Sequence, residues 1–490
     1  MNLKITTLLL AGLAITTHAA LPIPNNAAAN LVLGQPNFTS SASLNPPTAS
    51  SLAFPRAISI DSNSGKVFVA DTGNNRILRY SSTTALANGA AAEYVFGSSR
   101  FDDAVAGAFL SGMTTPFGVF VDRASRLWVA DTGNHRVLEF DNASLRNDLL
   151  PRAGRVFGQP DFNSRAASAA LGRMKDPAGV FVDGNDRLWV AVKGNDKVLR
   201  FDNVTTKVSG SIEDGSFGLT APTVLDLYFY NGTLLSGPSS IAVSSAGSLF
   251  VADLYTHRVL RFDNAATTPA NRIASAVFGQ PNLSSAMPAT SAVGMNSPSG
   301  LFLTPDDTLW VTDATNNRAL RFNNASTKVN GATADGVLGQ ADFTTKTPGL
   351  TNRGLSVPGY HPTVDASGNL WEPDAGNSRV LRFSPPTPIV PPIVPPVVVV
   401  DKTAPLLVLS TKIPKLVTKP QLLLKGTASD ASGIKSVQYR LGKSPLKLAT
   451  GTTNWSFKLP LKKGLNAVTL TATDTAGNVS VNKVIKIKRK

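Results

Sequence analysis

The sequence predicts an all-β protein in which a six-bladed β-propeller precedes a smaller β-sandwich. One fourteen-residue stretch occurs six times, and copies aligned on their fifth residue lie 60 or 61 residues apart. Such a fixed period indicates a repeat architecture. A change of composition near residue 400 predicts the second domain. The copies read VFVADTGNNRILRY at 67–80, LWVADTGNHRVLEF at 127–140, LWVAVKGNDKVLRF at 188–201, LFVADLYTHRVLRF at 249–262, LWVTDATNNRALRF at 309–322 and LWEPDAGNSRVLRF at 370–383.

Each repeat contains four short segments with the composition of β-strands. In the second repeat these are GVFVD, RLWVA, RVLEF and RVFG, and Gly, Asn, Asp or Pro bounds each of them. Four antiparallel strands per repeat are typical of propeller blades, which bury both faces against their neighbours. Leu127 and Val129 on one face, and Trp128 and Ala130 on the other, are therefore all apolar. We interpret the recurring tryptophans as packing between blades rather than as sugar-stacking groups; they are Trp128, Trp189, Trp310 and Trp371.

A second motif predicts how the ring closes. VLGQPNF at 32–38 recurs as VFGSSRF, VFGQPDF, VFGQPNL and VLGQADF, each after a copy of the first motif. The last copy ends at Phe383 and has no such strand after it, so we expect the spare strand at 32–34 to complete the sixth sheet. Interleaved ends would remove an exposed sheet edge. The segment 21–30, rich in Pro, Ala and Asn, is expected to be loosely held.

The flanking segments predict a secreted protein. Residues 1–20 combine Lys4, an apolar run and a small-residue cleavage zone, which is typical of a signal peptide. No later stretch approaches the ~20 apolar residues of a membrane span. The absence of cysteine excludes disulfides and thiolate chemistry, and secretion without cysteine favours a bacterial source. Residues 384–400 form a proline-rich linker, which we interpret as a semi-rigid spacer.

Residues 401–490 have the strand length and turn density of a β-sandwich with Trp455 in its core. This domain contains 17 Lys and Arg but only 3 Asp and Glu, whereas the first 400 residues contain 30 and 29. The net charge of +15 therefore belongs almost wholly to one end of the chain. Lys483–Lys490 alternates charged and apolar residues as an edge strand would. The excess charge points to an acidic partner such as an anionic envelope polymer.

Two family resemblances follow from these motifs. The V-A-D-x-x-N-x-R-V-L-x-F pattern resembles the NHL repeat over about residues 31–383. That resemblance implies a six-bladed propeller used mainly to bind proteins, glycans or nucleic acids, although a few relatives are enzymes. GTASD at 426–430 and TATDTAGN at 471–478 resemble bacterial immunoglobulin-like domains.

Each regular repeat carries an Asp and an Arg five residues apart. The third repeat has Val192 and Lys197 instead, and it is the only one to lose either residue. We infer that the Asp caps backbone N–H groups and holds the guanidinium across a turn, which is a stabilising role. A ring of ligand-binding arginines is the alternative. The pairs are Asp71/Arg76, Asp131/Arg136, Asp253/Arg258, Asp313/Arg318 and Asp374/Arg379.

Metal chemistry has weak support in the sequence. After signal removal only His135, His257 and His361 remain, whereas a zinc site needs three or four converging ligands. The peptide-amidating propeller lyase uses a histidine-bound metal, and this chain lacks the histidines to copy it. Ca²⁺ is an alternative for the acids that end the inner strands, although turn formation also explains them. These acids are Asp61, Asp122, Asp183 and Asp365.

The sixth repeat departs from the others. Val357–Pro362 replaces the usual inner-strand pattern, and Glu372-Pro373 replaces Val-Ala. Such a departure indicates either strain where the ends join or a functional site. Because inner strands border the central channel, Tyr360 and His361 are the candidate ligand-binding residues.

We therefore predict a secreted or envelope-associated binding or scaffold protein whose propeller face takes protein or glycan ligands. The basic domain would tether it to an anionic polymer. The alternative is a propeller enzyme of lyase or lactonase type with its site at the channel mouth, although no hydrolase, phosphate-binding or metalloprotease motif occurs. Dedicated nucleic-acid binding is not expected, since aromatic residues do not interleave with the basic ones.

Overall fold

The computed structural model describes residues 22–218, 232–267, 273–386 and 401–490. They form two compact units, Met1–Pro388 and Ile389–Lys490. The described regular structure consists of β-strands and short 3-10 helices. No helix in these ranges is long and apolar enough to cross a membrane. The predicted signal peptide lies outside the described residues, as does most of the proline-rich linker.

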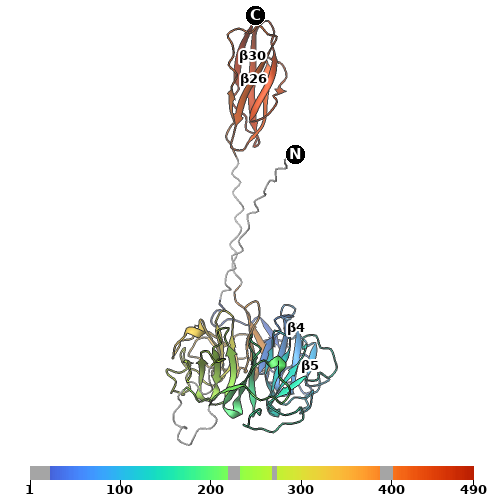
Figure 1. Cartoon of the computed structure of the whole chain (residues 1–490), viewed down its shortest axis with the longest axis vertical. Helices are drawn as coiled ribbons and strands as arrows, with labels where there is room; N and C mark the ends of the chain where they lie inside the picture. Colours follow the sequence, from blue (N-terminus) through green and yellow to red (C-terminus); the bar gives the residue numbers. More distant parts are fainter. Residues whose placement is uncertain (1–21, 219–231, 268–272, 387–400) are drawn as a thin grey trace. The chain divides into compact units, whose positions relative to one another are not determined.

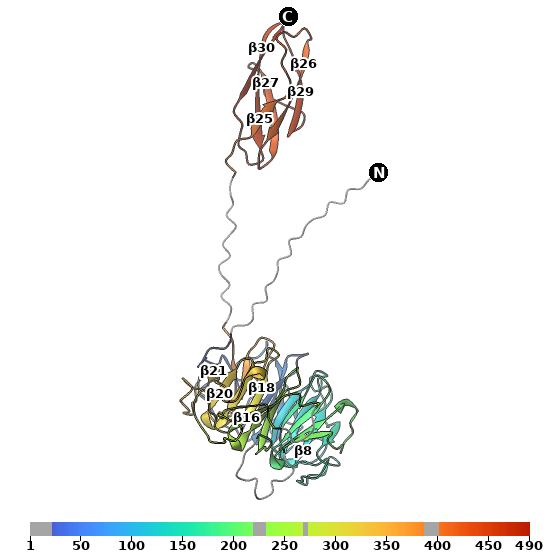
Figure 2. The same cartoon turned by 60° about the vertical axis from the view of Figure 1, so that its left-hand side comes forward.

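The described part of the first unit contains six four-stranded antiparallel sheets (Figures 1 and 2). The first comprises β2 (Ala57–Ile60), β3 (Lys66–Asp71), β4 (Arg76–Ser82) and β5 (Tyr94–Phe96); the second β6 (Pro116–Val121), β7 (Leu127–Asp131), β8 (Arg136–Phe140) and β9 (Arg155–Phe157); the third β10 (Pro177–Val182), β11 (Leu188–Val192), β12 (Lys197–Phe201) and β13 (Gly215–Phe217). The fourth comprises β14 (Pro238–Val243), β15 (Leu249–Asp253), β16 (Arg258–Phe262) and β17 (Ala276–Phe278); the fifth β18 (Pro298–Leu303), β19 (Leu309–Asp313), β20 (Arg318–Phe322) and β21 (Gly336–Leu338); the sixth β22 (Thr363–Val364), β23 (Leu370–Asp374), β24 (Arg379–Phe383) and β1 (Leu31–Leu33).

A 3-10 helix joins the second and third strands of each of these six sheets. The residue after each helix has a left-handed backbone, with φ between 51° and 56°. These helices are η1 (Thr72–Asn74), η2 (Thr132–Asn134), η3 (Lys193–Asn195), η6 (Leu254–Thr256), η7 (Ala314–Asn316) and η9 (Ala375–Asn377). Two others, η4 (Val204–Thr206) and η8 (Ala325–Thr327), follow the third strands of their sheets.

Each sheet shares a buried apolar cluster with each of its two neighbours. Leu127 and Val129 pack with the first sheet, whereas Trp128 and Ala130 pack with the third. Period-two alternation thus sends successive side chains into different interfaces. The predicted fold class, a β-propeller followed by a β-sandwich, is confirmed. The interpretation of the tryptophans as core residues is also confirmed, since all four are at most 4% exposed.

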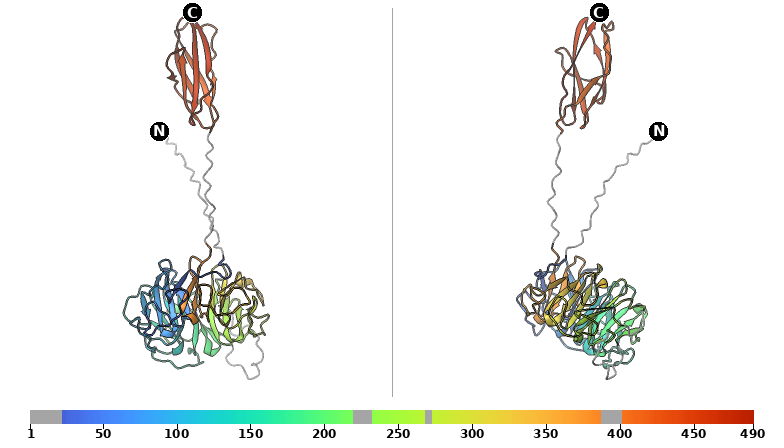
Figure 3. Two further views of the ribbon diagram at one scale, coloured as in Figure 1. Left: turned by 180° about the vertical axis from the view of Figure 1, so that it is seen from behind. Right: turned by 90° about the vertical axis from the view of Figure 1, so that its left-hand side faces the viewer.

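The ends of the first unit interleave as predicted. β1 pairs antiparallel with β24, with Val32 opposite Leu381. Figure 3 shows the blue and orange segments side by side. Leu31 and Leu33 join the cluster between the sixth and first sheets, and Val32 joins the one between the fifth and sixth. The spare strand therefore completes the last sheet and joins it to both neighbours.

The expectation that residues before β1 are loosely held is wrong. Ile23 is 4% exposed, and its carbonyl accepts a hydrogen bond from Arg321 at 2.7 Å. The Asn25 side chain accepts the N–H of Val337 at 3.0 Å, and the Asn26 N–H donates to the Val337 carbonyl at 2.9 Å. These bonds cover the outer edge of the fifth sheet, so tertiary contacts override the composition.

The second unit is a β-sandwich. One sheet has the order β25 (Leu406–Leu409), β26 (Gln421–Ser429), β29 (Asn454–Pro460); the other has the order β28 (Lys447–Leu448), β27 (Ile434–Leu441), β30 (Gly464–Asp474), β31 (Lys483–Arg489). Both sheets contribute to one apolar cluster that contains Trp455, as expected. β31 lies at a sheet edge, which confirms the interpretation of the basic C-terminal segment.

Candidate binding site at the channel mouth

Asp131 and Arg136 meet across the turn around η2, where they are opposite each other in the β7–β8 register. The Arg136 Nε donates to Asp131 Oδ2 at 2.7 Å, and both side chains are fully buried. Asn134 donates to the same oxygen at 2.8 Å, and the Thr114 N–H donates to Asp131 Oδ1 at 2.7 Å. Arg136 also donates to the carbonyls of Phe162, Phe109 and Gly112. The pair thus ties its turn to two loops.

The same arrangement occurs in four other sheets. The Nε–Oδ2 distance is 2.7 Å in the first, fifth and sixth sheets and 3.0 Å in the fourth. Burial raises the pKa of each carboxyl, whereas the arginine and the other donors oppose that rise. The structure thus brings together Asp71/Arg76, Asp131/Arg136, Asp253/Arg258, Asp313/Arg318 and Asp374/Arg379.

The third sheet replaces this network with a smaller one. Val192 is buried in an apolar cluster, and Lys197 forms no ion pair with any described residue. The Asn195 side chain accepts the Lys175 N–H at 2.8 Å, which substitutes for the missing carboxylate. Lys193, the first residue of η3, is left half-buried with no ion-pair partner in the described chain.

His135 and His257 occupy equivalent structural positions. Each follows a 3-10 helix and has a left-handed backbone. The Nδ1 of His135 accepts the Asp176 N–H at 3.1 Å, and that of His257 accepts the Ser297 N–H at 3.0 Å. Asn75 accepts a backbone N–H in the same way in the first sheet. The two histidines therefore serve separate turns and do not converge on one ion.

The acids at the ends of the inner strands also have separate partners. Asp122, Asp183 and Asp365 each accept the indole N–H of their own sheet's tryptophan at 2.9–3.0 Å. Asp61 instead accepts Ser64, Ser125 and Ser144, and these bonds hold its pKa below its usual value although burial opposes them. Their geometry is that of capped turns, and Ca²⁺ binding there stays a prediction.

The central channel is narrow, and His361 lies inside it. His361 is 6% exposed, and its Nδ1 lies 3.1 Å from the Ser240 Oγ of the fourth sheet. Burial lowers its pKa to about 4, and its Nε2 has no hydrogen-bond partner among the described residues. The cavity measures about 40 Å³, which is room for only a water or two. Its lining is mostly apolar and comes from all six inner segments, including Ile58, Val119, Val180, Ile241, Leu301 and Pro362.

Tyr360 lies at one mouth of this channel in a cluster of aromatic and cationic groups. Its ring centroid is 5.1 Å from that of Phe117, and the Arg56 guanidinium carbon is 5.1 Å from Tyr360 and 5.5 Å from Phe117. The Lys193 Nζ lies 5.4 Å from the Phe117 centroid. Burial raises the pKa of Tyr360, and the Arg56 charge partly opposes this. Four sheets thus contribute to one half-buried group, which we call the mouth cluster.

Glu372 is a second departure in the sixth sheet. It is fully buried, and its Oε1 accepts the Thr312 hydroxyl at 2.8 Å. Its Oε2 has no hydrogen-bond partner in the described residues. Burial raises the pKa of Glu372 to about 8. The carboxyl is therefore mostly protonated at neutral pH, and it lies between the fifth and sixth sheets.

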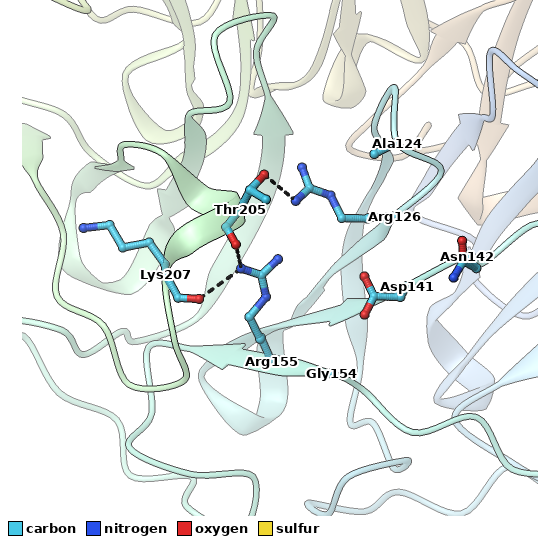
Figure 4. Close-up of a pocket in the computed structure, with 8 residues that line it drawn as sticks. All are labelled: Ala124, Arg126, Asp141, Asn142, Gly154, Arg155, Thr205 and Lys207. Carbon is cyan, nitrogen blue, oxygen red and sulfur yellow. Dashed lines mark hydrogen bonds between the residues drawn. The ribbon is translucent and has the colours of Figure 1, made fainter.

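A larger depression, of about 500 Å³, lies on the second and third sheets (Figure 4). Arg126 in its wall pairs with Asp122 at 2.6 Å, and Arg155 pairs with Glu139 at 2.5 Å. Arg155 also donates to the carbonyls of Thr205 and Lys207 (Figure 4). The positive charges of this depression are thus already engaged, unlike those of the mouth cluster.

The second unit separates its charges. Its three acids, Asp401, Asp430 and Asp474, have carboxylate oxygens within 4.8 Å of one another, a grouping that could hold a metal ion. The 17 cations of residues 401–490 form no ion pair with any described residue. Asp430 and Asp474 belong to the motifs at 426–430 and 471–478, but no local pattern in the sequence joins them to Asp401.

Tyr360 could be predicted from the sequence as a residue of the channel mouth, but three of its neighbours could not. Phe117 appeared only as part of a strand, and Arg56 precedes β2 without belonging to a motif. Lys193 had a visible signal, since it follows the position where the third repeat loses its Asp. Aligning the inner segments on the acids that end them would have placed Arg56, Phe117 and Tyr360 together, since each lies five residues before such an acid.

Comparison with known proteins supports the class of repeat. A sequence profile of the NHL repeat matches residues 52–80 and 235–262, so the chain contains NHL repeats. No curated protein matches the chain.

Several solved structures are similar in fold. They include a streptogramin B lyase (12% identity, 70% of this chain and 95% of that one, TM-score 0.41), a virginiamycin B lyase from Staphylococcus aureus (13%, 69% and 80%, 0.37) and a gluconolactonase from Xanthomonas campestris (13%, 75% and 98%, 0.41). At these identities and TM-scores the similarity carries no information about the ligand or activity of this chain.

Proposed function

We propose that this chain is a secreted or envelope-associated binding and scaffold protein. Its six-bladed NHL propeller would take a protein or glycan ligand at the channel mouth beside Tyr360. The observation that supports this is that the Asp and Arg side chains that recur in the repeats form ion pairs within the fold, whereas Arg56 and Lys193 pair with no acid in the described chain. Half-buried groups without partners on a rigid scaffold are typical of recognition sites.

Capture of ligands from glycan and peptide libraries tests this proposal. Phe117→Ala removes one wall of the mouth cluster, whereas Phe120→Ala removes a half-buried ring from the same strand at the other end of the channel. We expect the intact protein to capture a ligand, Phe117→Ala to weaken that capture and Phe120→Ala to preserve it. Equal loss in both variants, or no captured ligand, would contradict a site at this mouth.

We further propose that the second unit is an immunoglobulin-like domain that tethers the protein to an anionic envelope polymer. The strand orders β25-β26-β29 and β28-β27-β30-β31 support the first part. The unpaired cations support the second, because an uncompensated positive surface attracts polyanions. Arg440, Lys486 and Lys488 are all exposed on one face of the four-stranded sheet, opposite Thr469, Ala467 and Leu465 in the register.

Retention on an anionic polymer tests the tether. Replacing Arg440, Lys486 and Lys488 by Gln should lower the salt concentration needed for elution of the full chain. The matched control replaces three exposed propeller arginines by Gln, namely Arg123, Arg152 and Arg165, which removes the same total charge. Similar elution of both triple variants would show that only net charge matters, and no retention of the intact chain would refute the tether.

A propeller enzyme of lyase or lactonase type is the second candidate. The unpartnered Nε2 of His361 favours it, because a neutral imidazole with a free nitrogen is a potential proton acceptor. The described residues of the first unit contain no group of three His, Asp or Glu close enough to hold a metal, so a metal-dependent enzyme does not fit them. Turnover of a lactone or an eliminable substrate that His361→Gln abolishes would favour the enzyme over the binding protein.

A further inference from the structure

The mouth cluster carries two positive charges and no negative one. We propose that Arg56 and Lys193 form a binding site for an oxyanion, a carboxylate or phosphate group carried by the ligand. This proposal rests on the proposed binding function and names the chemistry of its site. It differs from the tether, which lies in the other unit and needs many weak charges rather than one fixed site.

Arg56 is held in place by rings rather than by an acid. Its guanidinium carbon lies within 5.5 Å of the centroids of Phe117 and Tyr360, which is the range of cation–π attraction. Its Nε is buried and has no hydrogen-bond partner in the described residues, while its terminal nitrogens are not similarly buried. A guanidinium fixed in this way retains its planar fork, which matches the two oxygens of a carboxylate or phosphate.

Lys193 supplies the second charge because the third sheet departs from the repeat. In the first and second sheets this position is Thr72 or Thr132, whose hydroxyl donates to the carbonyl of Pro116 or Pro177 at 2.6 Å. The lysine cannot reproduce that short contact, and its Nζ lies over the Phe117 ring instead. The position that holds a hydrogen-bonding Thr in the first two sheets thus holds a lysine in the third, and this lysine contacts the same Phe117 ring as Arg56.

The other features of the mouth agree with an anionic ligand. The Tyr360 hydroxyl has no hydrogen-bond partner in the described residues, so it is available as a donor. By contrast, Arg126 and Arg155 in the larger depression are neutralised by nearby carboxylates. The other end of the channel is lined by Phe120 and Phe181, which carry no charge. Positive charge that no acid offsets therefore gathers at one mouth of the channel.

Calorimetric titration of the full chain with three matched sugars tests the proposal. Glucuronate and glucose 6-phosphate carry a carboxylate or a phosphate at carbon 6 of the same sugar, and glucose carries neither. We expect at least one anionic sugar to bind and glucose to bind at least ~10-fold more weakly, which corresponds to about 1.4 kcal/mol. The tighter of the two anions identifies the source of the oxyanion. Equal affinity for glucose, or no binding of either anion at millimolar concentration, would overturn the proposal.

Charge variants locate the site. Arg56→Gln and Lys193→Gln should each weaken binding of the anionic sugar several-fold, and Arg56→Lys should have an intermediate effect because it keeps the charge but loses the fork. Arg123→Gln removes an exposed charge beyond the other end of β6 and should leave affinity unchanged. If Arg56→Gln fails to fold, Lys193→Gln alone decides. Unchanged affinity in both Gln variants would overturn the oxyanion site; library ligands captured through Phe117 would then leave the proposed function standing.

Discussion

The turns of the second and third sheets have the same backbone conformation, but their charged side chains differ in whether they find partners. In the second sheet, a buried carboxylate and guanidinium form an ion pair, and further hydrogen bonds engage the carboxylate, so the turn presents no unpaired charge. In the third, Val192 and Asn195 hold the same turn without an ion pair, and Lys193 remains unpaired by any described acid. The comparison shows that the regular turn engages its charges within the fold, whereas the turn that departs from the pattern leaves a lysine without an acidic partner.

Removing the buried carboxylate of the second sheet should have the largest effect. Asp131→Ala leaves Arg136 buried without its counter-charge, and breaking a buried pair in this way costs about 3–5 kcal/mol. Chemical unfolding measures the loss. Lys197→Ala in the equivalent turn of the third sheet is the control and should cost less than about 1 kcal/mol, because no ion pair is broken there. Unchanged stability of Asp131→Ala together with lost ligand binding would refute the structural role of the pairs.

Glu372 should produce a smaller, pH-dependent effect. Its pKa in the folded protein is about 8 against an ordinary 4.5, so the folded state holds this proton more tightly than the unfolded state. The contribution of Glu372 to stability is therefore complete below about pH 4.5 and is lost as pH rises through 8. Between pH 6.5 and 8 this amounts to about 2 kcal/mol, at roughly 1.4 kcal/mol per pH unit.

His361 makes the opposite contribution at lower pH. Its folded pKa of about 4 lies below the ordinary 6.5, so its contribution is complete above 6.5 and is lost as pH falls towards 4. Because the other buried carboxyls with a raised pKa are present in both proteins, the difference in unfolding free energy between the intact protein and Glu372→Gln isolates Glu372 between pH 6.5 and 8. We expect the intact protein to lose more stability than Glu372→Gln across this window. Parallel curves for the two proteins would show that the buried carboxyl is not protonated.

Most of the fold could be predicted because six copies of one pattern agree on where strands and turns lie, whereas a single copy would leave the secondary structure ambiguous. Six copies of the stretch around Trp128 showed strand, turn and strand at a fixed interval, and both faces were apolar. Even the pairing of β1 with β24 followed from counting strands at the two ends. The segment containing Ile23 and Asn25 was misjudged, because its order comes from contacts with the fifth sheet rather than from its own composition.

The mouth cluster could be predicted only in part. Tyr360 was found because it lies in an irregular strand, whereas Arg56 and Phe117 lie in regular surroundings and meet it only when the ring closes. Glu372 was noticed as a departure, but its partner Thr312 lies in the neighbouring sheet, and no local pattern joins them. The predictable parts are thus those within one sheet, and the unpredictable ones depend on how sheets meet.

The smallest expected effect is that of His135→Asn. It tests whether His135 supports its turn in the same way as the Asn residues at this position in other repeats. The Asn75 and Asn317 side chains accept backbone N–H groups at 2.8 Å from the same turn position that His135 uses at 3.1 Å. Asn also tolerates the left-handed backbone there. His135→Asn should therefore stay within about 0.5 kcal/mol of the intact protein, whereas His135→Ala should lose about 1 kcal/mol with its acceptor. Thermal unfolding of the two variants measures the difference. A large loss of stability in His135→Asn, together with stabilisation of the intact protein by added metal, would show that His135 binds an ion rather than supporting a turn.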